Sequence, residues 1–294
     1  MGECCSTHVE EEVTVKKRII TVSTTNRVGG AQDGKKPQKF EWSLDQRLKD
    51  EIRDLYEDHR HKIDEELDSR DHVHKKNFEM RNVSVVPEGF YEGSWNTKLN
   101  QRVGEGRIVF HNGVFYHGQF ERNVPHGVGL KIFPSGDIYF GDFINGKIEG
   151  FGEYITSEGT RYEGDFTNNL KDGNGTQEWE NGAYYEGGWK QGKKHGKGKL
   201  EFPDGSTYEG GFVNDRYHSK GIFRWADGKK YAGQYHKGKR HGDGKFVWPN
   251  GKIYQGTWNK GKQNGGGICS RGGTKRMTEY EKGRLTKVYR DDCL

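Results

Sequence analysis

Aromatic residues and glycines recur at a fixed step along about two-thirds of this chain. Tyrosine returns every 23 residues, after one leading step of 25. The tyrosines of the series are Tyr91, Tyr116, Tyr139, Tyr162, Tyr185, Tyr208, Tyr231 and Tyr254. A period of this size without drift predicts a repeat array rather than a single globular core.

Within one repeat, the pattern has the period of a β-strand. Tyr185, Gly187 and Trp189 stand at i, i+2 and i+4, so they share one face of a strand. Glu186 and Gly188 fall on the other face, and we expect them to be wetter. Because the glycine between the two rings has no Cβ, an aromatic ring can lie flat against the backbone there.

A second run with period two follows in each repeat after a polar segment. In one repeat the run is Gly198, Leu200 and Phe202, and it closes with Asp204-Gly205. Asparagine or aspartate followed by glycine tolerates the positive φ of tight turns. Each repeat is therefore predicted to be one β-hairpin, and the array to hold about sixteen antiparallel strands in consecutive order.

The combined pattern, Y-x-G-x-[WF] with a later [HD]-G-x-G and a closing [DN]-G, resembles the MORN repeat family. The resemblance covers Tyr91 to Gly267 and comprises seven full repeats and a degenerate C-terminal one. It implies an elongated, twisted antiparallel sheet of β-hairpins that holds proteins together, at membranes or in ciliary and other cytoskeletal structures. The predicted fold class is thus an all-β repeat array, preceded by one amphipathic helix and an extended N-terminal tail.

Five segments are predicted along the chain. Residues 1–42 form a tail and linker, 43–69 a helix, 70–90 a connector, 91–267 the array, and 268–294 a degenerate repeat that caps it. The linker is indicated by glycine and proline near the end of the first segment. Valine and isoleucine alternate in part within the tail, and two interpretations stay open: an added strand, or a segment lying extended on a partner.

The predicted helix is amphipathic. Ser43 and Gln46 form a capping box at its start. Apolar residues then follow on one face at steps of three, four and eight: Leu44, Leu48, Ile52, Leu55, Ile63 and Leu67. This stripe has three interpretations, namely docking on the chain's own sheet, pairing with a partner helix, or pairing with a second copy in a homodimer.

Composition argues against an ordinary aliphatic core, and no catalytic motif stands out. Hydrophobic residues make up 30%, whereas 45 glycines and 37 aromatic residues (7 Trp, 15 Tyr, 15 Phe) fit a thin sheet of stacked rings. His126, His195 and His241 recur beside glycine at one repeat position, which favours a role in turns over metal or acid–base chemistry. The G-x-G pairs lack the third glycine and the helix of a dinucleotide site. We predict a non-enzyme that uses no cofactor and no metal.

The N-terminal residues carry a competing signal for membrane attachment. Gly2, Cys4 and Cys5 fit the outline of an N-myristoylation site with two palmitoylatable cysteines, although Glu3 is poorly accepted at such sites. No apolar run approaches the roughly 20 residues of a membrane span, and no signal peptide begins the chain. These features favour a cytoplasmic protein of the cytoskeleton or cilium, with membrane association as the alternative.

Charge is uneven along the chain. Residues 183–294 hold 24 Lys and Arg against 11 Asp and Glu. The clusters are predicted in loops that line one edge of the sheet and form a basic stripe. The stripe consists of Lys190, Lys193, Lys194, Lys197, Lys237, Lys239, Arg240, Lys260 and Lys262.

The stripe is either a solubilising edge or a docking surface for an acidic partner. Nucleic acid is disfavoured, because the aromatic residues belong to the ladder and do not interleave with the lysines. The prediction is a non-catalytic scaffold that binds other proteins in a cytoskeletal or ciliary complex. The alternative is a peripheral membrane scaffold that binds anionic phospholipid through its basic repeats.

Overall fold

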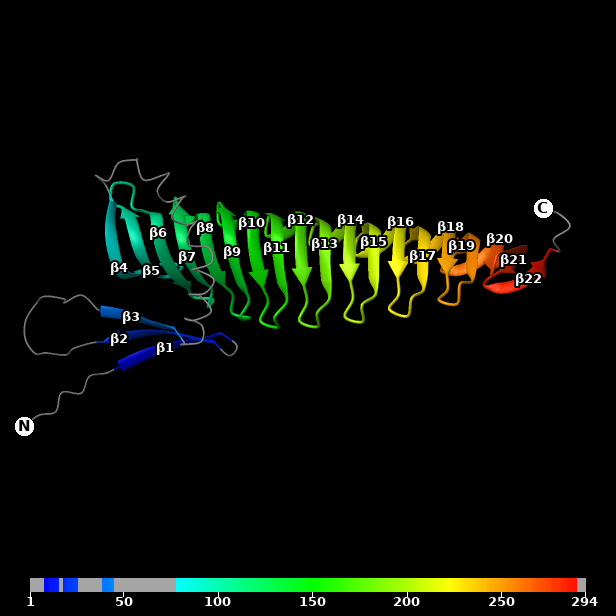
Figure 1. Cartoon of the computed structure of the whole chain (residues 1–294). Helices are drawn as coiled ribbons and strands as arrows, with labels where there is room; N and C mark the ends of the chain where they lie inside the picture. The colour runs from blue at the N-terminus through cyan, green and yellow to red at the C-terminus, as the bar shows by residue number, and fades with distance from the viewer. Residues whose placement is uncertain (1–7, 16–17, 26–38, 45–77, 290–294) are drawn as a thin grey trace, which may run out of the picture. The chain divides into compact units, whose positions relative to one another are not determined.

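The structure, a computed structural model, describes residues 8–15, 18–25, 39–44 and 78–289 (Figure 1). The chain divides into two compact units, residues 1–157 and 158–294. Every regular element in the described residues is a β-strand, which confirms the all-β part of the prediction. Over these same residues, no helix has the length and apolar character needed to cross a membrane.

The N-terminal part of the first unit contains a three-stranded antiparallel sheet. Its strands are β1 (His8–Val15), β2 (Arg18–Thr25) and β3 (Lys39–Leu44). β1 pairs with β2 from His8↔Thr25 to Val15↔Arg18, and β2 pairs with β3 from Ile20↔Leu44 to Thr25↔Lys39. The alternating valines and isoleucines of the tail therefore form strands that pair within the chain.

The predicted start of the helix is wrong. Ser43 and Leu44 lie in β3, where they pair with Thr21 and Ile20 of β2. β-branched and aromatic residues favour strand pairing. Here the pairing of β3 with β2 overrides the local capping signal. Residues 45–77 lie outside the described part of the chain, so the apolar stripe from residue 48 to residue 67 stays a prediction. The acylation signal at Gly2, Cys4 and Cys5 lies outside it as well.

The repeats of the first unit form an antiparallel sheet in which each strand pairs with the next in sequence. Its strands are β4 (Phe78–Val86), β5 (Gly89–Asn96), β6 (Gln101–Phe110), β7 (Phe115–Glu121), β8 (Val124–Ile132), β9 (Ile138–Ile144) and β10 (Lys147–Ile155).

The second unit continues the same order of antiparallel pairing. Its strands are β11 (Arg161–Thr167), β12 (Leu170–Glu178), β13 (Tyr184–Lys190), β14 (Lys193–Glu201), β15 (Thr207–Val213), β16 (Arg216–Arg224), β17 (Lys230–His236), β18 (Lys239–Val247), β19 (Ile253–Asn259), β20 (Lys262–Arg271), β21 (Thr274–Glu281) and β22 (Arg284–Val288). In neither unit do the described first and last repeat strands pair with each other, so both sheets are open. The consecutive order predicted from the sequence is confirmed within each unit.

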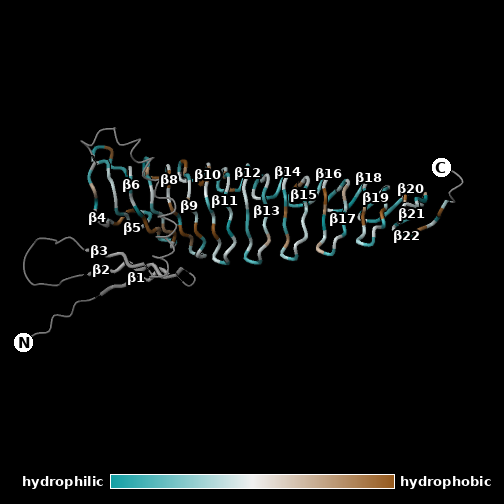
Figure 2. The backbone as a smooth tube through the Cα atoms, viewed as in Figure 1, coloured by the Kyte–Doolittle hydropathy of each residue, from teal (hydrophilic) through white to brown (hydrophobic). Residues whose placement is uncertain are grey.

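Two kinds of turn join the strands, and Figure 2 colours most of them as hydrophilic. Inside a repeat, the turn has two residues with positive φ, such as Gln191 (50°) and Gly192 (77°) between β13 and β14. Two positive values define a type I′ turn, which matches the twist of the flanking strands. Between repeats, the predicted Asp204-Gly205 turn is confirmed: the amide of Gly205 donates to the carbonyl of Phe202 at 2.9 Å.

The polar segment inside each repeat is therefore not the loop that the sequence predicted. Strands β13 and β14 continue through it and leave only two residues for the turn. The charged side chains of this segment alternate between the two faces of the sheet, as strand residues do. This alternation separates the predicted basic residues from one another.

The core is a ladder of aromatic rings on one face of each sheet. Tyr185 is 0% exposed, and its hydroxyl donates to the carbonyl of Gly188 at 2.9 Å. Its ring meets Trp189 of its own repeat at 5.3 Å and Phe212 of the next at 5.2 Å, both edge to face. Burial raises the pKa of Tyr185 well above its ordinary value. All eight tyrosines of the series are buried and donate to the carbonyl three residues further on.

A glycine slot is present, but it lies at Gly198 of the neighbouring strand and not at Gly187, between the two rings, where the sequence predicted it. A Cβ added to Gly198, which pairs with Gly187, would lie 2.5 Å from the hydroxyl of Tyr185. No Cβ fits under the ring without displacing it. The predicted division of faces is confirmed, because Tyr185 and Trp189 are buried whereas Glu186 is exposed.

Candidate functional site

The type I′ turns of the second unit stand in a row along one edge of its sheet. Three of them show how a backbone hydrogen bond joins a turn to the start of the second strand of the preceding repeat. The amide of Gly192 donates to Lys171 O at 2.8 Å, Gly238 to Tyr217 O at 2.9 Å, and Gly261 to Arg240 O at 2.9 Å. Neighbouring turns are two strands apart, which is about 9.6 Å at the usual strand spacing.

Six of the nine basic residues predicted from the sequence flank these turns, and we call this set the basic edge. All six are exposed, and none forms an ion pair with another residue in the described part of the chain. The basic edge consists of Lys190, Lys193, Lys237, Lys239, Lys260 and Lys262. They flank three turns, at 191–192, 237–238 and 260–261. Cations without ion pairs create a positive potential that attracts an anionic surface.

Lys194 and Arg240 do not belong to this edge, contrary to the prediction. The guanidinium of Arg240 lies 4.4 Å from the ring centre of Trp258 and donates to Gly261 O at 2.8 Å. The amine of Lys194 lies 5.0 Å from the ring of Trp179, and its side chain is only 16% exposed. Cations held over aromatic faces stabilise the sheet and are less available to a partner.

Lys197 does not belong to the basic edge either. It lies in the interior of β14, directly opposite Gly211 of β15, on the face away from the tyrosine ladder. The single basic stripe predicted from the sequence is therefore three separate groups of side chains: the basic edge, the cations over the rings, and Lys197 on the opposite face.

The sequence prediction missed two further basic residues, one at the edge of the sheet and one over an aromatic ring. Arg216 is exposed at the start of β16 and stands 23 residues from both Lys193 and Lys239, so the period alone identifies it. Lys171 precedes Lys194 by the same step and lies 4.5 Å from the ring of Tyr162. Burial, together with the charge of Lys194, lowers the pKa of Lys171 to about 8.

The recurring histidines take part in the backbone geometry of the repeats. His126, His195 and His241 each precede a glycine with left-handed φ, between 56° and 72°. The Nδ1 atoms of His126 and His195 are buried and have no hydrogen-bond partner. Across the described ranges, no three His, Cys, Asp or Glu side chains are grouped to hold a metal ion.

Comparison with family models identifies the repeats. The model described as "MORN repeat" matches eight consecutive segments: residues 91–115, 116–138, 139–161, 162–184, 185–207, 208–230, 231–253 and 254–273. These matches cover well over half of the chain, and the chain belongs to the MORN repeat family. Repeats of this family typically serve as scaffolds for contact with proteins or membranes.

The other comparisons add little. No curated protein matches the sequence. Among solved structures, the chain is similar to the "SAS-4 (dCPAP) TCP domain in complex with a Proline Rich Motif of Ana2 (dSTIL) of Drosophila Melanogaster". That likeness has 18% sequence identity and a TM-score of 0.34, and it covers 53% of this chain and 84% of the other. A likeness at this level carries no inference about what the chain binds.

Proposed function

We propose that this MORN-repeat chain is a non-catalytic scaffold in a cytoplasmic assembly of the cytoskeleton or cilium, and that its basic edge docks an acidic protein partner. The observation that carries the proposal is the row of exposed lysines without ion pairs along the turns of the second unit. Asp215 lies on the turn between Lys193 and Lys237, but it pairs with Lys194 at 3.5 Å and not with a lysine of the basic edge.

The spacing of the row suits an extended acidic surface better than a small ligand. Neighbouring turns lie about 9.6 Å apart, which is close to the Debye length of about 8 Å at physiological salt. A single exposed ion pair contributes only about 0–1 kcal/mol, so several turns must be engaged together. The binding should therefore weaken steeply as salt rises.

The recurring residues that elsewhere support chemistry have structural roles here. Tyrosine hydroxyls are bonded to backbone carbonyls, glycines accommodate the rings, and the histidines precede backbone kinks. These uses support a binding protein rather than an enzyme.

A peripheral membrane scaffold is the second candidate, and the same row of lysines favours it. Each lysine near an anionic membrane contributes about 1 kcal/mol. An acylated N-terminus at Gly2, Cys4 and Cys5 would supply the anchor. A homodimer formed through the predicted helical stripe stays a further prediction.

The test uses two full-length variants that lose the same charge. The edge variant carries Lys193→Gln, Lys239→Gln, Lys260→Gln and Lys262→Gln. The control variant carries Arg224→Gln, Lys229→Gln, Lys230→Gln and Lys252→Gln, which flank two turns between repeats at the opposite edge. Tagged proteins are expressed in ciliated cells, which are extracted with detergent at increasing salt.

Wild type and the control variant should remain with the insoluble cytoskeletal fraction at low salt, whereas the edge variant should be released. Equal retention of both variants would remove the basic edge as the docking surface. Release of the wild type with the detergent-soluble membrane fraction, together with flotation on phosphatidylserine vesicles, would instead support the membrane candidate.

A further inference from the structure

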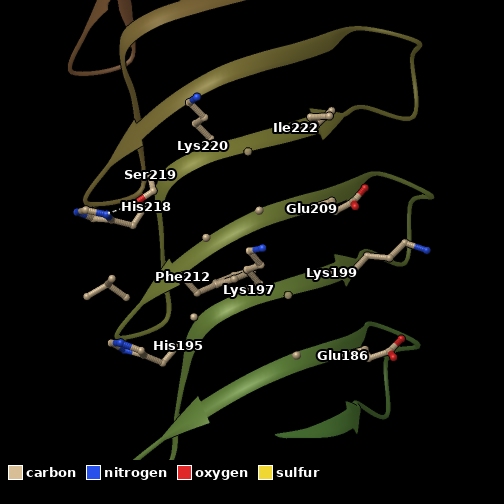
Figure 3. Close-up of a pocket in the computed structure, with 17 residues that line it drawn as sticks. Glu186, His195, Lys197, Lys199, Glu209, Phe212, His218, Ser219, Lys220 and Ile222 are labelled. Carbon is tan, nitrogen blue, oxygen red and sulfur yellow. Dashed lines mark hydrogen bonds between the residues drawn. The ribbon is translucent and has the colours of Figure 1, made fainter.

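A groove of about 1130 Å³ crosses strands β13 to β16 on the face opposite the tyrosine ladder. It lies wholly within the second unit, away from the basic edge. Its floor is backbone, because glycines of all four strands line it. Figure 3 shows Lys197 and Lys220 in the middle of the groove, with His195 and His218 toward one end and Glu186 toward the other.

The groove exists because two successive repeats lack a side chain that other repeats carry. In the repeat before it, the carboxylate of Asp165 accepts a hydrogen bond from the amide of Asn174 at 2.7 Å. Gly188 and Gly211 take the place of Asp165 in the next two repeats, and Gln234 restores a side chain in the third. A Cβ added to Gly188 would lie 2.3 Å from the carbonyl oxygen of His195, so the backbone itself has closed over this position.

The same two repeats gain a lysine. Lys197 and Lys220 stand at the position that Asn174 occupies in the preceding repeat and Asp243 in the following one. Both lysines are exposed, and neither forms an ion pair with any described residue. The loss of a carboxylate and the gain of an ammonium group thus coincide twice, 23 residues apart.

The remaining charges of the groove leave these two ammonium groups as its accessible cations. Lys199 lines the groove but is already paired with Glu201 at 2.6 Å. Asp165 and Asp243 carry carboxylates in the repeats on either side.

Glu186 and Glu209 also line the groove, and both lie opposite Lys199 at one end of it, away from Lys197 and Lys220. An anionic segment is therefore attracted along the middle of these two repeats, and it is repelled at their acidic end and in the repeats on either side.

We propose that this groove binds an extended acidic segment of a partner protein, with acidic side chains at every third residue. Lys197 and Lys220 lie on strands two apart, which places their backbones about 9.6 Å from each other. A chain in polyproline II conformation has three residues per turn and rises about 3.1 Å per residue, so residues i and i+3 point the same way about 9.3 Å apart. In a β-strand, residues on one side are about 6.6 or 13.2 Å apart, and neither distance matches.

The glycine floor suits such a segment. At positions 188 and 211 the backbone carbonyls of His195 and His218 occupy the place of a side chain, so the floor is low and a ligand chain can lie close to the sheet while its acidic groups reach the lysines. This site is separate from the basic edge and does not rest on the function proposed above.

Three labelled peptides test the proposal on the full-length chain: two of one composition but different spacing, and one without charged side chains. The first is (Glu-Pro-Pro)3, the second places its three glutamates at alternate positions, and the third is (Gln-Pro-Pro)3. Fluorescence anisotropy should show the first binding at least about fivefold more tightly than the second, and the third not at all.

Two double variants locate the binding. Lys197→Gln with Lys220→Gln should weaken the (Glu-Pro-Pro)3 peptide at least about fivefold, whereas Lys239→Gln with Lys262→Gln, a loss of equal charge from the basic edge, should change it less than about twofold. All four side chains are exposed, and circular dichroism on heating should give all variants the same melting temperature.

Several results would overturn the proposal. Equal binding of the two glutamate peptides, or equal weakening by both double variants, would show attraction to a basic surface and not to the groove. No binding by the wild type would overturn it directly. Displacement of the peptide by inorganic phosphate, but not by chloride of equal ionic strength, would show a site for small anions instead.

Discussion

Trp189 links two repeats of the ladder, so its replacement tests the packing most severely. The ring is 6% exposed and meets Tyr162 of the preceding repeat at 5.2 Å and Tyr185 of its own at 5.3 Å, both edge to face. Its indole Nε1 donates to the carbonyl of Gly175 at 3.2 Å. Trp189→Ala removes both ring contacts and this hydrogen bond together.

The size of the effect follows from these contacts. Truncation of a buried tryptophan to alanine costs about 3–5 kcal/mol, and the two edge-to-face pairs place this site near the upper half of that range. Trp189→Phe is the matched control, because Phe166 and Phe212 hold the same position in the neighbouring repeats and make the same ring contacts at 5.1 Å. That change removes only the indole hydrogen bond and part of the ring, so it should lower the free energy of unfolding by about 1 kcal/mol.

The assay is equilibrium unfolding in urea, followed by circular dichroism and by tryptophan fluorescence. Agreement of the two signals shows whether the array unfolds as one unit, which repeat proteins do not always do. We expect the alanine variant to lose about 4 kcal/mol and the phenylalanine variant about 1 kcal/mol. A loss below about 0.5 kcal/mol for alanine, or equal losses for both variants, would show that the ring does not form the core.

Three further substitutions test separate parts of the account. Gly198→Ala should cost about 2 kcal/mol or more in urea unfolding because its Cβ meets a tyrosine ring, whereas Gly266→Ala, which has open space and no left-handed φ, should change stability by less than about 0.5 kcal/mol. Arg240→Gln should lower the melting temperature because it removes a cation from over a ring, whereas Lys239→Gln on the exposed edge should leave it unchanged; equal effects would contradict the division of the basic residues. The pKa of Lys171 is about 8 in the folded chain and 10.5 ordinarily, so the unfolded chain binds the extra proton between these values and stability should rise with pH from about 8 toward 10. Lys171→Met should lose this rise, and identical pH profiles for both proteins would refute the pKa assignment.

The strands and the ladder could be predicted from the sequence because their signals are periodic. A tyrosine, a glycine and a second ring at alternate positions specify one buried face, whatever the neighbouring strand does. The strands and their buried face could be predicted without knowledge of how the strands pair. The glycine slot could not: the spacing placed it at Gly187, whereas the pairing of β13 with β14 brings the ring of Tyr185 against Gly198.

Whether each lysine side chain is exposed at the edge or lies over an aromatic ring depends on how the strands pair, so it could not be predicted from the sequence. Lys193 and Lys194 are neighbours, yet one is exposed on the edge and the other lies over aromatic rings. The register between β13 and β14 shifts between Gly187 and Trp189, and such a bulge changes which face later residues take. A charged segment with glycine resembles a loop locally, while the type I′ turn keeps nearly all of it in strands.

The groove and the misplaced helix start show two other limits of sequence reasoning. Gly188 was correctly placed on the wetter face, but only comparison with Asp165 one period earlier shows that a side chain is missing there. At Ser43, a local capping signal competed with pairing to β2, which is distant in sequence. Contacts of that kind are not visible in a short window of residues.

The docking of an acidic partner on the basic edge is tested most directly by carbodiimide cross-linking, which joins lysine amines to carboxylates in contact. The tagged full-length chain is cross-linked in extracts of ciliated cells, and the joined lysines are identified by mass spectrometry. The account predicts that intermolecular cross-links concentrate on Lys193, Lys239, Lys260 and Lys262 and disappear at high salt. Cross-links that spare these four and fall on Lys229, Lys230 and Lys252 at the opposite edge would contradict it.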